Sequence, residues 1–133
     1  MLSKVFVVQS LGYVILKTYL ENAFPEINER ISYSDSFDQA IEMISKEKGR
    51  IYVFTSHMFH DISRTQSESK TIPHLEKNSN TFAKIIKEMN SNAKVYVYSF
   101  FEPPMEFIDG YLHKIEGSTV SMNELANFIK KLK

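Results

Sequence analysis

Short apolar segments rich in β-branched residues recur along this chain, and they alternate with segments in which apolar residues have helical spacing. Strands that are apolar on both faces are typical of parallel sheets covered by helices on both sides. Right-handed crossovers between such strands give a doubly wound arrangement. The pattern therefore predicts an α/β fold with three layers around a five-stranded parallel sheet. The strands are expected at 4–8, 30–33, 50–55, 94–99 and 110–115.

The helices are expected to fill the intervals between these strands. Ser36 with Gln39, and Ser121 with Glu124, have the spacing of a capping box, in which two side chains satisfy free N–H groups at a helix start. The connection at 102–107 has room for one or two helical turns. We expect helices at 11–24, 36–48, 82–89 and 121–132. The whole chain, 1–133, is expected to form one domain with a long polar loop at 57–78.

Composition narrows the range of functions. Sixteen basic residues balance sixteen acidic ones, so charge gives no reason to expect nucleic acid or an anionic membrane as a partner. The absence of cysteine excludes disulfides and thiol catalysis. The apolar run at 5–8 is too short for a signal peptide, and no segment is long enough to span a membrane. We therefore expect a cytoplasmic protein.

Ligands of open parallel sheets bind at the carboxyl ends of the strands. Here Gln9 and Ser10 follow the first strand, while Thr55 ends the third and Ser99 the fourth. Lys114 lies at the end of the fifth. A magnesium site needs carboxylates, because Mg²⁺ prefers hard oxygen ligands. The first and third strands supply none at these positions.

The segment 107–114 resembles the fifth strand of response-regulator receiver domains, whose fold is CheY-like and flavodoxin-like. In that family an aromatic residue stands three positions before a conserved-type lysine, as Tyr111 does before Lys114. Ser99 matches the family's Ser/Thr position at the end of the fourth strand. The resemblance covers the whole chain in topology, but only this stretch is specific in sequence.

The chain departs from the receiver pattern where phosphorylation takes place. The family has an acidic pair where this chain has Gln9 and Ser10, and a phosphoacceptor aspartate where it has Thr55. Ile115 stands where a proline usually follows the lysine. Aspartyl phosphorylation needs a carboxylate nucleophile and a metal ion that neutralises phosphoryl charge. The resemblance thus implies a degenerate receiver, or pseudo-receiver, related to two-component signal transduction.

A pseudo-receiver is expected to act through protein contacts and not as an enzyme. In the family, the face made by helix 4, strand 5 and helix 5 is the usual binding surface for a protein partner or a second copy. Carried over, this implies Met105, Phe107 and Tyr111, with Tyr111 as a candidate switch. Met105 and Phe107 belong to an apolar cluster that also includes Phe100 and Phe101.

Two alternatives remain open at this level. His57, His60 and Asp61 form a usable set of transition-metal ligands, although their spacing matches no strong zinc signature. The rim of strand ends could also hold a nucleotide, a flavin or another small ligand, as flavodoxin-like folds do. Ser10 and Gly12 are a weak match to a phosphate-binding turn, so no cofactor is predicted. Lys114 could bind an anion or contact Thr55 or Ser99.

Overall fold

The computed structural model describes residues 3–9, 13–57, 78–115 and 118–133. Five parallel strands form one sheet in the order β2-β1-β3-β4-β5. The strands are β1 (Lys4–Val8), β2 (Ile31–Ser34), β3 (Ile51–Thr55), β4 (Ala93–Ser99) and β5 (Gly110–His113). The helices are α1 (Tyr13–Ala23), α2 (Pro25–Asn28), α3 (Phe37–Ile44), α4 (Ser79–Met89) and α5 (Thr119–Lys130). The predicted fold class is confirmed.

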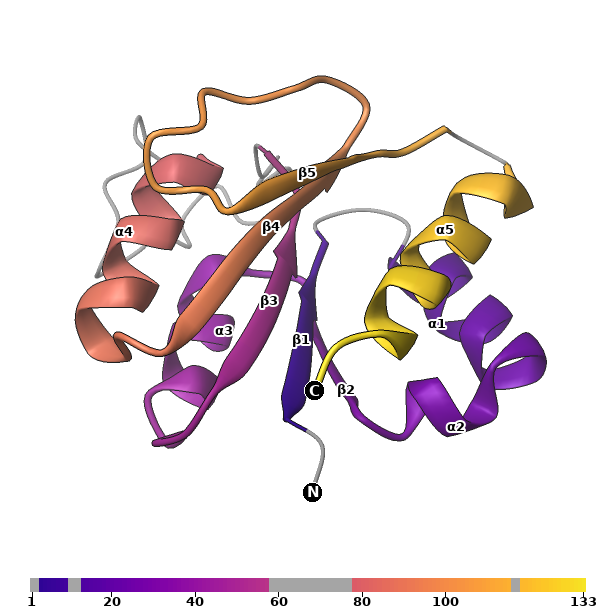
Figure 1. Cartoon of the computed structure of the whole chain (residues 1–133), viewed down its shortest axis with the longest axis horizontal. Coiled ribbons are helices and arrows are strands. Elements are labelled where there is room, and N and C mark those ends of the chain that lie inside the picture. The colour runs from indigo at the N-terminus through magenta and orange to yellow at the C-terminus, as the bar shows by residue number, and fades with distance from the viewer. Residues whose placement is uncertain (1–2, 10–12, 58–77, 116–117) are drawn as a thin grey trace.

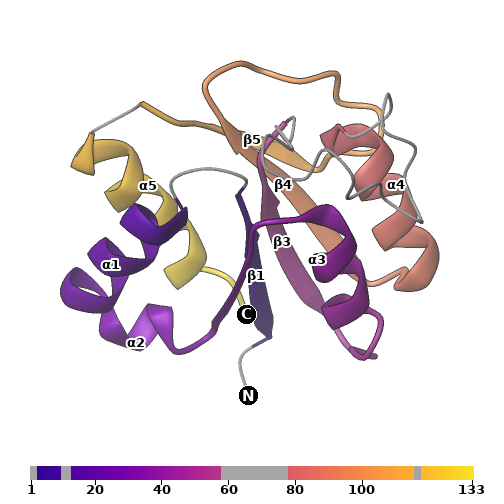
Figure 2. The same ribbon diagram turned by 180° about the vertical axis from the view of Figure 1, so that it is seen from behind.

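Helices cover both faces of the sheet. Figures 1 and 2 show α3 and α4 on one side and α1, α2 and α5 on the other. Alternate residues of each central strand enter opposite cores: Phe6 packs towards α3 and α4, whereas Val7 packs towards α1 and α5. Every residue of β3 is buried. Burial on both faces explains why the sequence shows continuous apolar runs in place of polar alternation.

One of the two predicted capping boxes begins a helix. Ser36 caps α3, and its hydroxyl accepts a hydrogen bond from the Gln39 backbone N–H at 3.1 Å. The side chain of Gln39 does not return the bond, because its Oε1 accepts from the Ser34 hydroxyl at 3.0 Å. Only one of the two hydrogen bonds of the predicted capping box is therefore present, the one from the Gln39 N–H to the Ser36 hydroxyl.

The second capping box is wrong. Helix α5 begins at Thr119 with Ser118 as its cap, whose hydroxyl accepts from the Val120 N–H at 3.2 Å. Ser121 is buried inside the first turn, where its hydroxyl donates to the carbonyl of Ser118 at 3.2 Å. The cap is therefore the serine three residues before the predicted one, and Ser121 is a buried residue within the helix.

The predicted helical turns between β4 and β5 are also wrong: residues 100–109 contain no helix. Pro103 and Pro104 cannot donate backbone hydrogen bonds, and each disfavours helical geometry in the residue before it. Hydrogen bonds to α4 and β4 hold this connection. Asn80 accepts from the Phe107 N–H at 2.9 Å, and Asp109 accepts from the Val95 N–H at 2.8 Å.

The predicted polar loop at 57–78 falls outside the described residues, except for its first and last positions. The prediction of a single domain over 1–133 stays a prediction. Among the helices that the structure describes, none is both long and apolar enough to cross a membrane.

Candidate functional site at the carboxyl ends of the strands

The parallel register brings the candidate residues to one edge of the sheet. Val8 lies beside Thr55, and Ser99 lies beside His113. Gln9 directly follows β1 and is only 1% exposed, so its amide is buried beneath the surface of this edge. We call the edge formed by the ends of β1, β3, β4 and β5 the rim. Ser10, the other predicted rim residue after β1, lies outside the described residues.

A hydrogen-bonded chain joins the two sides of the rim. The Lys114 ammonium donates to Oε1 of Gln9 at 3.3 Å, and Nε2 of Gln9 donates to the carbonyl of Tyr98 at 3.4 Å. The side chain of Lys114 thus reaches the glutamine after β1. Its backbone N–H donates to the Ser99 carbonyl at 2.8 Å, so the predicted contact with Ser99 is made through the backbone. The group that follows β1 at this edge is therefore a buried neutral amide.

Aromatic rings flank the same ammonium group. Lys114 Nζ lies 5.7 Å from the ring centre of Tyr98 and 5.5 Å from that of Phe100. Both distances lie within the range of a cation–π attraction. The Tyr98 hydroxyl lies 3.2 Å from the Ser121 hydroxyl, and burial raises the pKa of Tyr98. Tyr98 therefore stays a neutral ring beneath the lysine at ordinary pH.

Thr55 and Ser99, the predicted hydroxyl residues of the rim that the structure describes, bond to nearby backbone. Thr55 is fully buried, and its hydroxyl donates to the Ser56 carbonyl at 3.0 Å. The Ser99 hydroxyl donates to the Phe101 carbonyl at 2.6 Å. Each hydroxyl donor is thus used locally, and Thr55 ends β3 as part of the packed interior.

Tyr111 is half-buried and tied to the strand beside it. Its hydroxyl donates to the Ser99 carbonyl at 3.0 Å and lies 2.9 Å from Nδ1 of His113. Because the single phenolic proton goes to the carbonyl, the histidine nitrogen must donate to the phenol oxygen. Burial, followed by the Glu102 carboxylate, raises the pKa of Tyr111. The hydroxyl is held in one position by these two neighbours.

The metal hypothesis is tested only in part. His57 lies just beyond β3, where its Nδ1 is 2.9 Å from the Ser79 hydroxyl, and burial lowers its pKa. His60 and Asp61 lie outside the described residues. Across the ranges that the structure describes, no three His, Asp or Glu side chains are grouped closely enough to hold a metal ion. The described partner of His57 is a serine and not a second ligand.

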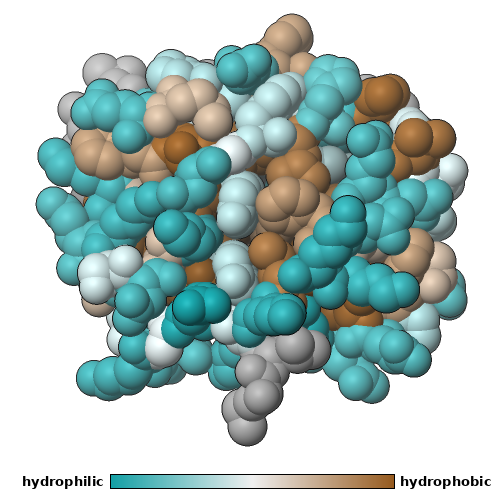
Figure 3. All heavy atoms as spheres, in the orientation of Figure 1, coloured by the Kyte–Doolittle hydropathy of each residue, from teal (hydrophilic) through white to brown (hydrophobic). Residues whose placement is uncertain are grey.

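An apolar surface lies beside the rim on the β4–β5 connection. Phe101 is 79% exposed, and Phe100 and Met105 are also exposed. Phe107 is different: it is half-buried and packs on the core beneath α4. We call Phe100, Phe101 and Met105 the connection patch. In the face shown in Figure 3, hydrophobic residues emerge between hydrophilic ones and do not form one continuous area.

Sequence reasoning missed the partners that organise this site. Tyr98 is 1% exposed in the core, and its ring also lies beside the Lys114 ammonium. His113 was not singled out, although it contacts the Tyr111 hydroxyl. The alternation of strand residues gives one available signal: His113 and Tyr111 are two positions apart and so share a face of β5.

Solved structures of response regulators and their receiver domains are similar in fold to this chain. The response regulator TrrA of Thermotoga maritima, solved in complex with Mg²⁺ and BeF, matches with a TM-score of 0.62 at 16% identity, covering 98% of this chain and 99% of that one. The signal receiver domain of an HD domain-containing protein from Pseudomonas fluorescens Pf-5 matches with a TM-score of 0.58 at 10% identity, over 96% of both chains.

A response regulator from Burkholderia pseudomallei, solved with a phosphorylated aspartic acid, matches with a TM-score of 0.56 at 12% identity, covering 96% of this chain and 71% of that one. No protein-family model matches the sequence, and no curated protein matches it. The chain therefore has the receiver fold, which is the fold that the strand-five resemblance implied. At these identities the likeness concerns the fold alone.

Proposed function

We propose that this protein is a receiver-like signalling module that works without aspartyl phosphate and through contacts with another protein. The observation that carries the proposal is the Lys114–Gln9–Tyr98 chain of hydrogen bonds across the rim. In a phosphorylatable receiver this space must admit a phosphoryl group and its cation. Here a buried neutral amide and its bonded lysine occupy it.

The chemistry of the rim supports phosphorylation independence. An amide and a threonine hydroxyl replace the carboxylates that would attack a phosphoryl donor and hold a hard cation. Thr55 is fully buried, and its hydroxyl proton is engaged with Ser56. Among the described residues, this hydroxyl is hydrogen-bonded to that backbone carbonyl and to no side chain that could act as its base.

The connection patch supports the interaction half of the proposal. Exposed aromatic and methionine side chains are enriched at the centres of protein interfaces. The receiver-derived expectation of a helix 4–strand 5–helix 5 face needs modification here, because 100–109 forms no helix. The proposed surface consists of the irregular connection carrying Phe101 and Met105, next to Tyr111 on β5.

The interaction test compares variants of the connection patch with a matched variant elsewhere. The full chain, Phe101→Ser and Met89→Ser are each immobilised and exposed to lysate from the source organism. Met89 is an exposed residue of α4 and serves as the control for loss of an apolar side chain. We expect a stoichiometric protein partner that the wild type and Met89→Ser retain and Phe101→Ser loses.

A thermal-shift screen against nucleotides, flavins and divalent metals addresses the ligand-binding alternative. A tightly bound ligand stabilises the folded state by mass action, so it raises the melting temperature. We expect no large shift with any of these probes. A large shift that Lys114→Met abolishes would contradict the proposal and establish the rim as a small-ligand site.

A further inference from the structure

One face of α4 contacts the connection between β4 and β5 at three points. The contacting residues are Asn80, Lys84 and Lys87, whose i, i+4, i+7 spacing places them on a single face of the helix. Figures 1 and 2 both show the connection passing beside this helix. The contacts reach Phe107 and Asp109, at the end of the connection that leads into β5. Helix α4 therefore holds one end of the segment that carries the connection patch.

The three contacts are of different kinds. Oδ1 of Asn80 accepts from the Phe107 N–H at 2.9 Å, and the Lys84 ammonium lies 5.9 Å from the centre of the Phe107 ring, within the range of a cation–π attraction. The Lys87 ammonium lies 2.7 Å from Oδ2 of Asp109, and this oxygen also accepts from a backbone N–H of β4. The backbone and the ring of Phe107 are thus both held, and Asp109 is held by α4 and β4 together.

The first turn of α4 is itself anchored to the end of β3. Asn78 caps the helix, and its side chain accepts from the Thr81 N–H at 3.0 Å. The Ser79 N–H donates to the His57 carbonyl at 2.6 Å, and the Ser79 hydroxyl lies 2.9 Å from Nδ1 of His57. Asn80 therefore belongs to a turn that is already fixed, which is what a residue that orders another segment requires.

The other end of the connection is held by β4. The Ser99 hydroxyl donates to the Phe101 carbonyl at 2.6 Å, and Pro103 in the middle of the connection is buried. Met105 lies between this buried proline and Phe107 and is itself exposed. The exposed segment that carries Met105 is therefore supported on its C-terminal side by α4.

From these contacts we infer that α4 fixes the conformation of the connection patch, with Asn80, Lys84 and Lys87 as positioning residues for the partner surface. The patch has no helix of its own to order it, because residues 100–109 contain none. A surface that is ordered before its partner arrives loses less conformational entropy on binding, so it binds more tightly. The inference rests on the proposed function only in assigning a protein partner to the patch. The ordering of the patch can be measured without a partner.

The chain has no tryptophan, so one substitution creates a unique fluorescent reporter of the patch. Met105→Trp, at an exposed position, serves this purpose, and the decay of its fluorescence anisotropy measures local motion on the nanosecond timescale. We expect Asn80→Ala and Lys87→Met, each added to this reporter chain, to raise the rapidly decaying fraction of the anisotropy. Asn80→Asp keeps an acceptor for the Phe107 N–H, so it is expected to leave the decay as in the reporter chain.

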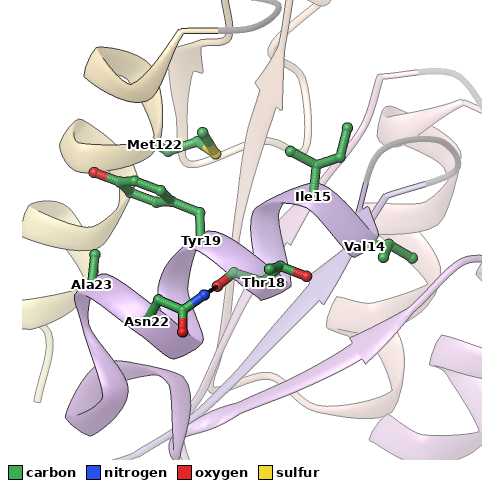
Figure 4. A pocket seen from close by; sticks show the side chains of 7 residues that line it. All are labelled: Val14, Ile15, Thr18, Tyr19, Asn22, Ala23 and Met122. Carbon is green, nitrogen blue, oxygen red and sulfur yellow. Dashed lines mark hydrogen bonds between the residues drawn. The ribbon is translucent and has the colours of Figure 1, made fainter.

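Three controls separate this effect from a general loosening of the fold. Thr81→Ala changes the neighbouring position of α4, and Lys94→Met removes an exposed lysine of β4. Neither should alter the decay of the Met105→Trp chain. Ile15→Trp moves the reporter to an exposed position of α1, beside the groove between α1 and α5 that Figure 4 shows. Asn80→Ala should leave the decay of this second reporter unchanged, because α1 lies on the opposite side of the sheet from α4.

The affinity for the captured partner is the second measurement, made on chains that keep Met105. We expect Asn80→Ala to weaken binding about 3- to 10-fold, the effect of about one more group that must be ordered on binding. Asn80→Asp is expected to bind like the wild type, a rescue that a loss of overall stability would not produce.

Three outcomes would overturn the inference. One is a Met105→Trp decay that Asn80→Ala and Lys87→Met leave unchanged. Another is a decay that Thr81→Ala changes as much as Asn80→Ala does. The third is a partner affinity that Asn80→Ala leaves unchanged although the patch has become mobile. The absence of any captured partner would contradict the proposed function and not the ordering of the patch, which the anisotropy of the isolated chain decides.

Discussion

The two sides of the rim differ in how closely their residues resemble the receiver pattern. On the β5 side, Tyr111 and Lys114 have the residue types and spacing of that family. On the β1–β3 side, Gln9 and Thr55 are neutral and buried. The difference teaches that an aromatic residue and a lysine with this spacing can serve structural roles. Lys114 is held by Gln9 and two rings, and Tyr111 by the neighbouring carbonyl, so both have uses that need no phosphate.

The largest expected effect comes from returning a carboxylate to the β3 end. Thr55→Asp places a charge at a fully buried position and should cost about 3–5 kcal/mol of unfolding free energy, the range typical of an uncompensated buried charge. Ser99→Asp at the half-buried end of β4 is the control and should cost much less. Urea unfolding measures both. Equal losses of unfolding free energy would mean that both strand ends exclude water equally, which would contradict the difference between the two sides of the rim.

On the β5 side, the largest loss of stability is expected at Gly110, which lies close to β4. A Cβ added there would lie 2.8 Å from Cδ1 of Tyr96, whose ring packs against Phe54 and Phe128. Gly110→Ala should therefore destabilise the protein by about 1–3 kcal/mol through overpacking. Gly49→Ala is the control, since its added Cβ meets nothing within 4 Å. Unfolding midpoints that respond equally to both changes would rule out this contact as the cause.

A double-mutant cycle measures the link between the two sides. Gln9→Ala and Lys114→Met each remove one end of the 3.3 Å hydrogen bond. We expect a coupling energy of about 1 kcal/mol, the net value of a typical intramolecular hydrogen bond. Strictly additive losses of unfolding free energy would show that the two side chains are not coupled in solution. The cycle would then remove the main observation behind the proposed function.

The smallest expected effect concerns pH. Burial lowers the pKa of His57 from its ordinary value of 6.5, so the folded state binds a proton less readily than the unfolded state. The stability due to neutral His57 is present above pH 6.5 and is lost as the pH falls below that value towards the folded pKa. His57→Asn, which can keep a hydrogen bond to Ser79, should flatten this part of the stability profile. A profile unchanged by the substitution would assign the pH dependence to other groups.

The fold could be predicted because strands buried on both faces appear in the sequence as continuous apolar runs. Val5 to Val8 all face one core or the other, so the run reads as a central parallel strand. The site could be predicted only as a set of strand ends. Nothing local indicates that Gln9 and Lys114 meet, because they are 105 positions apart and no pairing rule favours an amide with an ammonium group.

The errors have local physical causes. Two serines near the start of α5 are of a type that caps helices. Ser118 is the cap, whereas the Ser121 hydroxyl donates to the carbonyls of Ile115 and Ser118, which precede the helix. The β4–β5 connection has room for the one or two helical turns that the sequence analysis expects at 102–107. Pro103 and Pro104 prevent that geometry, and Asn80 holds the backbone in its place.

The most direct test of the central claim is the intact mass of the protein after incubation with acetyl phosphate and Mg²⁺, beside an authentic receiver treated identically. The account predicts that the authentic receiver gains one phosphoryl group and that this chain gains none. A stoichiometric adduct that hydroxylamine removes would show an acyl phosphate, with Asp35 and Asp61 as the first positions to map. An adduct resistant to hydroxylamine and acid would point to a hydroxyl such as that of Thr55, and either result would contradict phosphorylation-independent signalling.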